Sequence, residues 1–426
     1  MYQGGSNPVG KHGTFLNEAQ VPKISYDYQA CLGEFGQVRE SYQRLKTIHS
    51  FVSTYEEQLC DMKTYLPEGA SQIDPKDLDT LRYAVRSNGE SGFLFINNFQ
   101  DHAKMHPKKD VSVTIEMGET SYVFHSLSLE TDENCILPFH FDVEGIELTL
   151  ASAQPITDLE INGRKTYIFM VPDGMHSYFV WEDGVNVNGS PCKEYMLDPQ
   201  KEVQLFTITK GEKEVDILCL SRDFSNQMYV IKDQGLLFTS AAFMERDDAF
   251  YLEATEAVMQ LKCYPKALCE EYKNAEKIEK TEALKDSVLG TYKITTEQVH
   301  VDTKIKEVGF YRYAISFDGL KEAFMGEHVK DVRMQIEYRG DIGHAFIDGR
   351  MIHDNFCNHD TWEIGLREFA SELEQEPMTI YITPLKEGAK VNVESTMAAR
   401  MEEVDETFAE LRKVSMVPVY EVRLEK

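Results

Sequence analysis

From residue 80 onward the sequence is a series of short segments rich in Val, Ile, Phe, Tyr and Thr, with turn residues between them every eight to twelve positions. These residue types favour β-strands, and the spacing is typical of β-sandwiches. The first group of segments is 93–99, 111–115, 121–129, 146–151, 166–171, 203–209 and 215–221, and the second is 308–317, 332–338, 344–352, 378–385 and 419–425. A chain with this pattern has to fold mainly as β-sheet.

Three dipeptides predict tight hairpin turns: Asn162-Gly163, Asp173-Gly174 and Asp348-Gly349. Asn, Asp and Gly tolerate the positive φ angles that two-residue hairpins demand. We therefore expect one β-sandwich over residues 67–254 and a second β domain over 288–426. The stretch between them, 255–287, is charged and interrupted by Pro265, and its pattern predicts a helical connector.

Before the strands, residues 34–66 have the pattern of one long amphipathic helix. Its apolar residues recur at spacings of three and four: Phe35, Val38, Tyr42, Leu45, Ile48, Val52, Tyr55, Leu59, Met62 and Leu66. Pro67 and Gly69 are expected to end the helix. The first 33 residues are rich in Gly, Asn and Ser and cannot cover so long a stripe, so the helix needs another surface to pack against.

Charge excludes some classes of function. The chain has 44 Lys and Arg against 72 Asp and Glu, a net charge of −28. A surface this acidic repels phosphate backbones and anionic lipid, so we expect neither nucleic-acid nor membrane binding. No run of 18 apolar residues exists and no signal peptide is visible, which makes a cytoplasmic location the default expectation. The eight cysteines include no CxxC pair, and we expect reduced thiols and no cofactor.

One cluster of histidines and acids has the chemistry of a divalent-metal site. Its members, within 17 residues, are His344, Asp348, His353, Asp354, His359 and Asp360. Asp348 also fits a hairpin turn, and 354–360 also fits a polar loop, so we predict no metal here. Most other acids fall in solvated charge runs, and the GxSxG, P-loop and HExxH motifs are absent. The glycine-rich segment 86–92 precedes a strand and is expected to be a turn.

Aromatic side chains are the remaining candidates. Tyr26 and Tyr28 flank Asp27 just before the predicted helix, and an aromatic ring with a polar group suits the apolar face of a sugar. The alternative is that these rings pack the loop against the helix. The two tryptophans are Trp181 and Trp362, and the surroundings of Trp362 favour a packing role.

The N-terminal residues add a resemblance to a known family. Gly4-Gly5-Ser6-Asn7 is followed by a second motif made of Ser25, Tyr26, Asp27, Tyr28, Ala30, Leu32, Glu34 and Gly36. In order and spacing these residues resemble the last strand, loop and helix of the catalytic barrel of glycoside hydrolase family 35, the β-galactosidases. Residues 81–100, 136–151, 159–169, 341–369 and 378–385 are similar to the β domains that follow the barrel in that family, so the resemblance spans nearly the whole chain.

The resemblance implies that residues 1–66 are strand eight and helix eight of an incomplete (β/α)₈ barrel, followed by the β-sandwich of 67–254 and by a galactose-binding-like jelly roll at 288–426. The acid/base and nucleophile glutamates of such retaining enzymes would lie upstream of Met1, so this sequence holds no catalytic residue. Tyr28 is the position that contacts galactose in similar enzymes. Tyr26 is a second candidate for substrate binding and, like Asn7 and Glu34, is expected to support the loop.

We therefore expect the C-terminal part of a retaining β-galactosidase-like enzyme, inactive alone, whose parent hydrolyses terminal β-galactosides. One alternative is a free-standing carbohydrate-binding or structural module in which the jelly roll around Trp362 holds galactose-type sugars. Another is a subunit that is completed by a separate barrel polypeptide, or that associates with itself, through helix 34–66. Without the other barrel strands, Tyr28 is expected to be poorly positioned.

Overall fold

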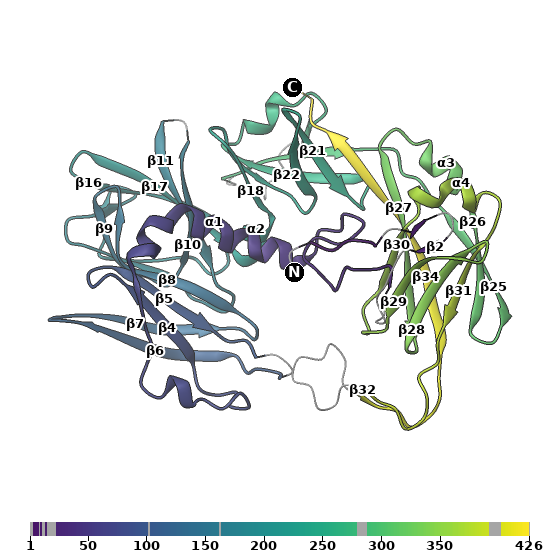
Figure 1. Cartoon of the computed structure of the whole chain (residues 1–426). Coiled ribbons are helices and arrows are strands. Elements are labelled where there is room, and N and C mark those ends of the chain that lie inside the picture. The colour runs from purple at the N-terminus through teal and green to yellow at the C-terminus, as the bar shows by residue number, and fades with distance from the viewer. Residues whose placement is uncertain are drawn as a thin grey trace.

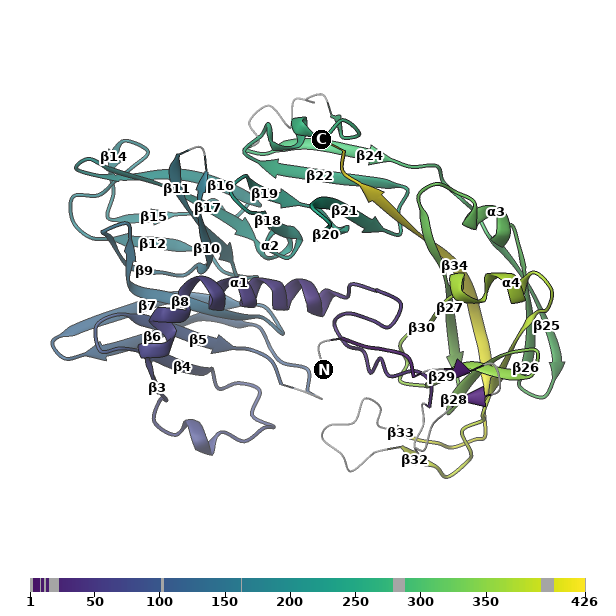
Figure 2. The ribbon, with the colours of Figure 1, turned by 45° about the horizontal axis from the view of Figure 1, so that its top comes forward.

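The computed structural model describes residues 3–7, 9–10, 13–14, 23–100, 103–161, 163–278, 288–391 and 402–425. It is mainly β. Its sheets form an arc of strand groups, and the N-terminal segment and helix α1 (Glu40–Asp61) lie inside this arc (Figures 1 and 2). Among the described residues, no helix is long and apolar enough to cross a membrane.

The first sandwich consists of two facing sheets. One has the strand order β15-β12-β9-β8-β5-β4-β3, with bounds Glu194–Met196, Tyr178–Trp181, Ile146–Ala151, Asn134–Val143, Gly92–Asn97, Arg82–Ser87 and Lys63–Tyr65. The other has the order β10-β11-β17-β16-β13-β14, with bounds Gln154–Ile161, Arg164–Val171, Lys213–Ser221, Val203–Lys210, Asn186–Val187 and Ser190–Pro191. Phe93 and Leu148 of the first sheet share a core with Phe169 and Phe206 of the second. This part of the predicted β-sandwich is confirmed.

A long hairpin covers the outer face of the first sheet. It consists of β6 (Lys108–Met117) and β7 (Thr120–Leu129). Leu94 and Ile96 of β5 pack with Phe124 of the hairpin, whereas Phe93, one position away, faces the sandwich core. Side chains alternate between the faces of a strand, so a strand buried on both faces becomes an unbroken apolar run. That is why residues 93–96, FLFI, are apolar without a break.

The next sheet has the order β18-β19-β22-β24-β23, with bounds Met228–Ile231, Gly235–Phe238, Val258–Tyr264, Gly290–Thr295 and Glu276–Lys277. It packs on the β10–β14 sheet of the first sandwich, where Leu236 and Phe238 of β19 share a core with Leu218 of β17. The predicted helical connector over 255–287 is wrong in its described part, 255–278, where 258–264 is a central strand and helix is limited to a short 3₁₀ turn, η2 (Leu268–Glu271). The part of this prediction at 279–287 lies outside the described residues.

The last sandwich consists of two further sheets that face each other. One has the order β20-β21-β34-β27-β30, with bounds Ala242–Arg246, Ala249–Ala254, Glu410–Arg423, Val329–Arg339 and Trp362–Gly365. The other has the order β25-β26-β31-β28-β29, with bounds Asp302–Gly309, Arg312–Asp318, Met378–Ile382, Ile342–Ile347 and Arg350–Phe356. Met334 and Ile364 of the former share a core with Ile315 and Ile380 of the latter. Because β21 pairs with β34, strand pairing crosses the boundary predicted at residue 254.

Several small elements complete the fold. They are the strand pairs β1 (Val9–Gly10) with β2 (Gly13–Thr14) and β32 (Lys390–Val391) with β33 (Glu402–Glu403), the helices α2 (Arg222–Gln227), α3 (Leu320–Phe324) and α4 (Ala370–Leu373), and the 3₁₀ turns η1 (Ala70–Gln72) and η4 (Arg367–Phe369). Of the predicted last barrel strand, residues 3–7 form isolated bridges, Gln3 with Leu32 and Ser6 with Ser25.

Helix α1 is shorter than the predicted 34–66. Gly36 has a φ of +76°, and Gly33 donates its N–H to the carbonyl of Gln37, so residues 33–38 form a turn before the helix begins. At the other end, Lys63–Tyr65 pairs with β4 as an edge strand ahead of Pro67. Phe51 and Tyr55 are buried with Phe93 and Phe141, so the helix packs on the first sandwich. Phe51, which the predicted stripe omits, is its most buried apolar residue.

The turns follow the dipeptide rule only in part. Asp348 and Gly349 have φ angles of 46° and 72° and join Ile347 to Arg350 as predicted. Asp173-Gly174 makes no hairpin, because β11 and β12 belong to different sheets and the turn carries the chain between them. Asn162 lies outside the described residues, although β10 and β11 pair on either side of it with Ile161 opposite Arg164. The segment predicted as one strand at 308–317 contains the turn between β25 and β26.

Candidate functional site

The loop formed by residues 23–39, which we call the tyrosine loop, is fastened to the last sandwich. Asp354, a buried residue of β29, accepts hydrogen bonds from the backbone N–H groups of Lys23, Ile24 and Ser25, the latter two at 2.8 and 3.1 Å. A buried carboxylate requires such donors, because an unpaired buried charge is very costly. The metal candidate Asp354 is therefore an anchor for a segment about 330 positions away.

The second fastening is a chain of buried hydrogen bonds from Trp362 through His353 to Glu34. The indole Nε1 of Trp362 donates to Nδ1 of His353 at 2.8 Å, and Nε2 of His353 lies 2.6 Å from a carboxylate oxygen of Glu34. An indole N–H is only a donor, so Nδ1 accepts and the ring proton resides on Nε2, which donates to Glu34. His353 is thus held in one tautomer and one orientation, with both ring nitrogens hydrogen-bonded.

Glu34 also orders the start of the chain. Its carboxylate accepts hydrogen bonds from the hydroxyls of Ser6 and Ser25, at 2.6 and 2.9 Å. Asn7 reaches the same loop through its side-chain amide, which donates to the carbonyl of Lys23 at 2.9 Å. Both residues support the loop, the role expected for them.

Asp27 holds the middle of the tyrosine loop together. Its carboxylate accepts the backbone N–H of Glu34 at 2.8 Å and forms an ion pair with Arg39, also at 2.8 Å. On the far side, the amide of Gln37 donates to Glu363 of β30 at 3.0 Å. The loop is therefore ordered both internally and by the sandwich, in contrast to the expectation that Tyr28 would lack a supporting shell.

The two candidate tyrosines project outward from this framework. Tyr26 is 41% exposed and Tyr28 is 49% exposed, and their rings meet edge to face with centroids 5.0 Å apart. Tyr28 and Gln29 have φ angles of 49° and 57°, in the left-handed region that residues with a Cβ rarely adopt. Backbone strain of this kind persists only where the surroundings enforce it, and it concentrates at functional sites.

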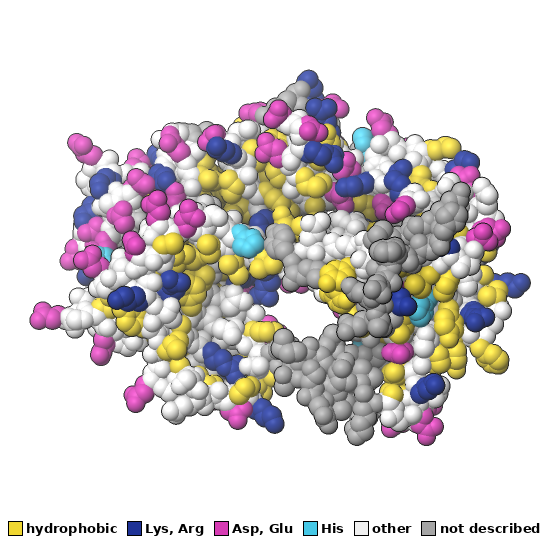
Figure 3. Space-filling model, in the orientation of Figure 1, with side chains coloured by type: hydrophobic (Ala, Val, Ile, Leu, Met, Phe, Trp, Pro, Cys, Tyr) yellow, Lys and Arg dark blue, Asp and Glu magenta, His cyan; other side chains and the backbone are white. Residues whose placement is uncertain are grey.

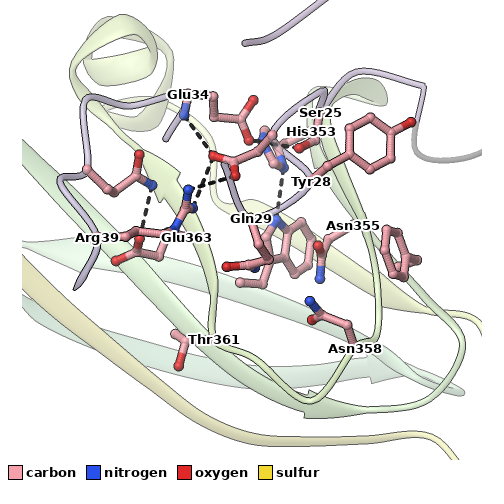
Figure 4. Close-up of a pocket in the computed structure, with 14 residues that line it drawn as sticks. Ser25, Tyr28, Gln29, Glu34, Arg39, His353, Asn355, Asn358, Thr361 and Glu363 are labelled. Carbon is pink, nitrogen blue, oxygen red and sulfur yellow. Dashed lines mark hydrogen bonds and ion pairs between the residues drawn. The ribbon is translucent and has the colours of Figure 1, made fainter. Parts of the chain in front are cut away.

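Beneath Tyr28, the loop and the last sandwich enclose a small polar pocket of about 40 Å³. Figure 4 shows Tyr28 and Gln29 on the loop side, with Asn355 and Asn358 opposite them. The residues lining it are Ser25, Asp27, Tyr28, Gln29, Glu34, Gln37, Arg39, His353, Asn355, Phe356, Asn358, Thr361, Trp362 and Glu363. Three of these are carboxylates and one is an arginine, a difference of two negative charges. The site can therefore hold hydroxyl groups but repels anions.

The remaining members of the histidine–acid cluster are dispersed. Asp348 occupies its hairpin turn, the ring of His344 stacks on Tyr381, and Asp360 hydrogen-bonds Asn358. Among the residues that the structure describes, no three His, Cys, Asp or Glu side chains are grouped as metal ligands. Trp181 and Trp362 are both buried, so packing, the role favoured for Trp362, is confirmed.

Sequence reasoning identified the tyrosines but missed the opposite wall of the pocket. Asn355 and Thr361 of that wall belong to no motif and lie more than 300 positions from the loop, and Gln29 stands at an unspecified position of the loop motif. Only the paired fold brings them together. A scan of protein-family models and a search of curated proteins found no match to the chain.

Proposed function

We propose that this chain is the C-terminal part of a retaining β-galactosidase-like hydrolase of glycoside hydrolase family 35, and that Tyr28, with Tyr26 beside it, contacts the galactoside. The observation that carries the proposal is the tyrosine loop itself. It has the residues of the family motif, and Asp354, His353 and Glu363 hold it so that both tyrosines project beside a polar pocket.

The chemistry of the site suits a sugar. Tyrosine rings pack against the apolar face of a pyranose, while amide and hydroxyl side chains pair with its hydroxyl groups. Trp362, the centre of the alternative lectin-like hypothesis, is 3% exposed and offers no ring face to a ligand. Sugar contact is therefore better assigned to the exposed tyrosines than to Trp362.

By itself, the chain is not expected to hydrolyse galactosides. Retaining hydrolysis requires a nucleophile and an acid/base carboxyl roughly 5–5.5 Å apart on either side of the scissile bond. Glu34 and Asp27, the carboxylates beside Tyr28, are fully engaged by His353 and by Arg39. Hydrolysis in the parent enzyme then depends on glutamates outside this sequence.

Two measurements test the proposal. Purified chain is expected to give no release of nitrophenol from nitrophenyl β-galactoside above a protein-free control, and turnover would overturn the inactive assignment. Methyl β-galactoside, followed by NMR, is expected to shift the ring signals of Tyr28. The variant Tyr28→Phe retains the ring and Tyr28→Ala removes it, so only the latter should abolish the shift that the sugar causes in the signals of the neighbouring Tyr26 ring. Tyr65→Ala is a matched control, since Tyr65 is 52% exposed but far along the chain in β3.

A second candidate function, a subunit completed by another polypeptide, is favoured by one flank of α1. Val52 is 44% exposed, and Leu45 and Ile48 are only partly buried. An uncovered apolar flank invites a partner. Light scattering is expected to show self-association that Val52→Glu abolishes. A monomer at every concentration would contradict self-association through this helix.

A further inference from the structure

The sandwich side of the pocket carries hydrogen-bonding groups that the protein does not use. The side-chain amide of Asn355 donates through Nδ2 to the hydroxyl of Tyr338 at 3.0 Å, which fixes the amide and leaves its Oδ1 without a partner among the described residues. The side chains of Gln29 and Thr361 are exposed and likewise bond to none of the described residues. A donor–acceptor set of this kind, on both walls of one pocket, is matched by pairs of hydroxyl groups.

The size of the pocket limits what enters it. A volume of about 40 Å³ holds roughly three water molecules. A whole pyranose ring does not fit, but hydroxyl or hydroxymethyl groups at the edge of a ring replace such waters and keep their hydrogen bonds. The ring itself would then lie at the rim, where Tyr28 and the half-buried Phe356 offer apolar surface.

The charge of the pocket selects among sugars. Asp27, Glu34 and Glu363 outnumber Arg39 by two charges, and the tautomer fixed by Trp362 keeps His353 neutral. The whole chain adds a net charge of −28. A sulfated, sialylated or uronic-acid unit placed here would face like charges at short range, which weakens its binding.

We propose that Asn355, Thr361 and Gln29 form a saccharide subsite for the unit attached to the galactose, and that this unit is a neutral sugar. The inference rests on the proposed function for the galactose itself, which stacks on Tyr28. The last sandwich then has two roles, because β29 fastens the tyrosine loop and, together with the segment before β30, also contacts the neighbouring sugar.

The test uses NMR of the intact chain with four ligands: methyl β-galactoside, lactose, cellobiose and a lactose that carries a sulfate on its glucose unit. Lactose is expected to shift the side-chain amide signal of Asn355, which is identified by its loss in Asn355→Ala, and to bind several-fold more tightly than methyl β-galactoside. Thr361→Ala and Gln29→Ala each change an exposed side chain. Each is expected to weaken lactose binding about fivefold, the effect of one hydrogen bond, and to leave the affinity for methyl β-galactoside unchanged. Thr120→Ala and Gln260→Ala, exposed residues of β7 and β22, are the matched controls.

The outcomes separate this inference from the function on which it rests. If the monosaccharide shifts Tyr28 but lactose leaves Asn355 unmoved, the subsite is overturned and the galactose contact stands. If cellobiose shifts Asn355 as strongly as lactose does, the saccharide subsite stands and the preference for galactose fails. Equal binding of the sulfated and neutral disaccharides at low salt would overturn the selection by charge. If no ligand shifts the signals of Tyr28 or Asn355, the galactose contact and the neighbouring subsite are both overturned.

Discussion

Trp362 selects the tautomer of His353: its indole Nε1 donates to Nδ1 of the imidazole at 2.8 Å, which leaves the ring proton on Nε2, facing Glu34. The indole itself is held by close packing, because Gly343 of β28 lies directly against its ring. We therefore expect the order of the tyrosine loop to depend on Gly343, through Trp362 and His353.

Gly343→Ala tests this dependence. A Cβ at this position would lie 2.6 Å from the indole of Trp362, so the ring has to move. Overpacking of this kind costs about 1–3 kcal/mol, and we expect amide exchange in residues 23–37 to accelerate as well. Gly309→Ala is the control, since its added methyl meets only the side chain of Arg312, at 3.7 Å. Unchanged exchange in the loop would show that the position of Trp362 does not order it.

Asp354→Asn removes the anchor of residues 23–25. In the native protein the backbone N–H groups of these residues donate to both carboxylate oxygens of Asp354. An asparagine keeps one acceptor oxygen but turns an NH₂ group, itself a donor, toward the remaining N–H groups. We expect a loss of about 1–3 kcal/mol in the free energy of unfolding, with lost protection of the amides of Ile24 and Ser25 in hydrogen exchange. Asp348→Asn, in an exposed hairpin turn where Asn is equally tolerated, is expected to change neither quantity.

Arg222→Met breaks a buried ion pair in the first sandwich. Arg222 and Glu133 are 4% and 2% exposed, and the guanidinium also reaches the carbonyl of Asn134. Removal of this cation leaves the buried Glu133 with the guanidinium of Arg44, 3.5 Å away, as its remaining cationic partner, so we expect a cost of about 3 kcal/mol in urea denaturation. Arg412→Met removes an exposed cation paired with Glu410 and is expected to cost less than about 1 kcal/mol. Equal effects of the two substitutions would contradict the assigned burial.

Lys46→Met is expected to change the pH dependence of stability. Burial between α1 and β18 lowers the pKa of Lys46 from 10.5 to about 7, although the Tyr229 ring, 3.4 Å from its Nζ, opposes that shift. Between about 7 and 10.5 the unfolded chain binds a proton that the folded chain does not, so stability rises with pH across this window. Denaturation at several pH values should show that the variant loses this slope. Lys193→Met, on an exposed side chain, should retain it.

The sequence predicted the strands of both sandwiches because β-branched and aromatic residues alternate with turns, a signal local to each strand. It failed where local signals compete. Phe35 and Val38 continue the helical period, but the positive φ of Gly36 and the hydrogen bond from Gly33 to Gln37 fold this segment into a turn. Likewise Asp173-Gly174 has the residues of a hairpin, but the strands beside it pair elsewhere.

Only the loop side of the candidate pocket could be predicted from the sequence. Tyr26 and Tyr28 stand in a contiguous motif, whereas their supports are distant: 319 positions separate Glu34 from His353, and 326 separate Gln37 from Glu363. The histidine–acid cluster attracted a metal hypothesis because its members are close in sequence. In the fold, His353 and Asp354 instead serve a loop at the other end of the chain.

This long-range fastening has a consequence for biosynthesis. The tyrosine loop is among the first parts of this sequence to leave the ribosome, but Ser25 waits 329 residues for the carboxylate of Asp354. At 5–20 residues per second, that delay is roughly 15–65 s. The first sandwich can fold in the meantime, while the buried acceptors and donors of the loop remain in water. The site is therefore completed only as synthesis of these 426 residues ends, and a chain that stops short of β29 would have its tyrosines but not the geometry to use them.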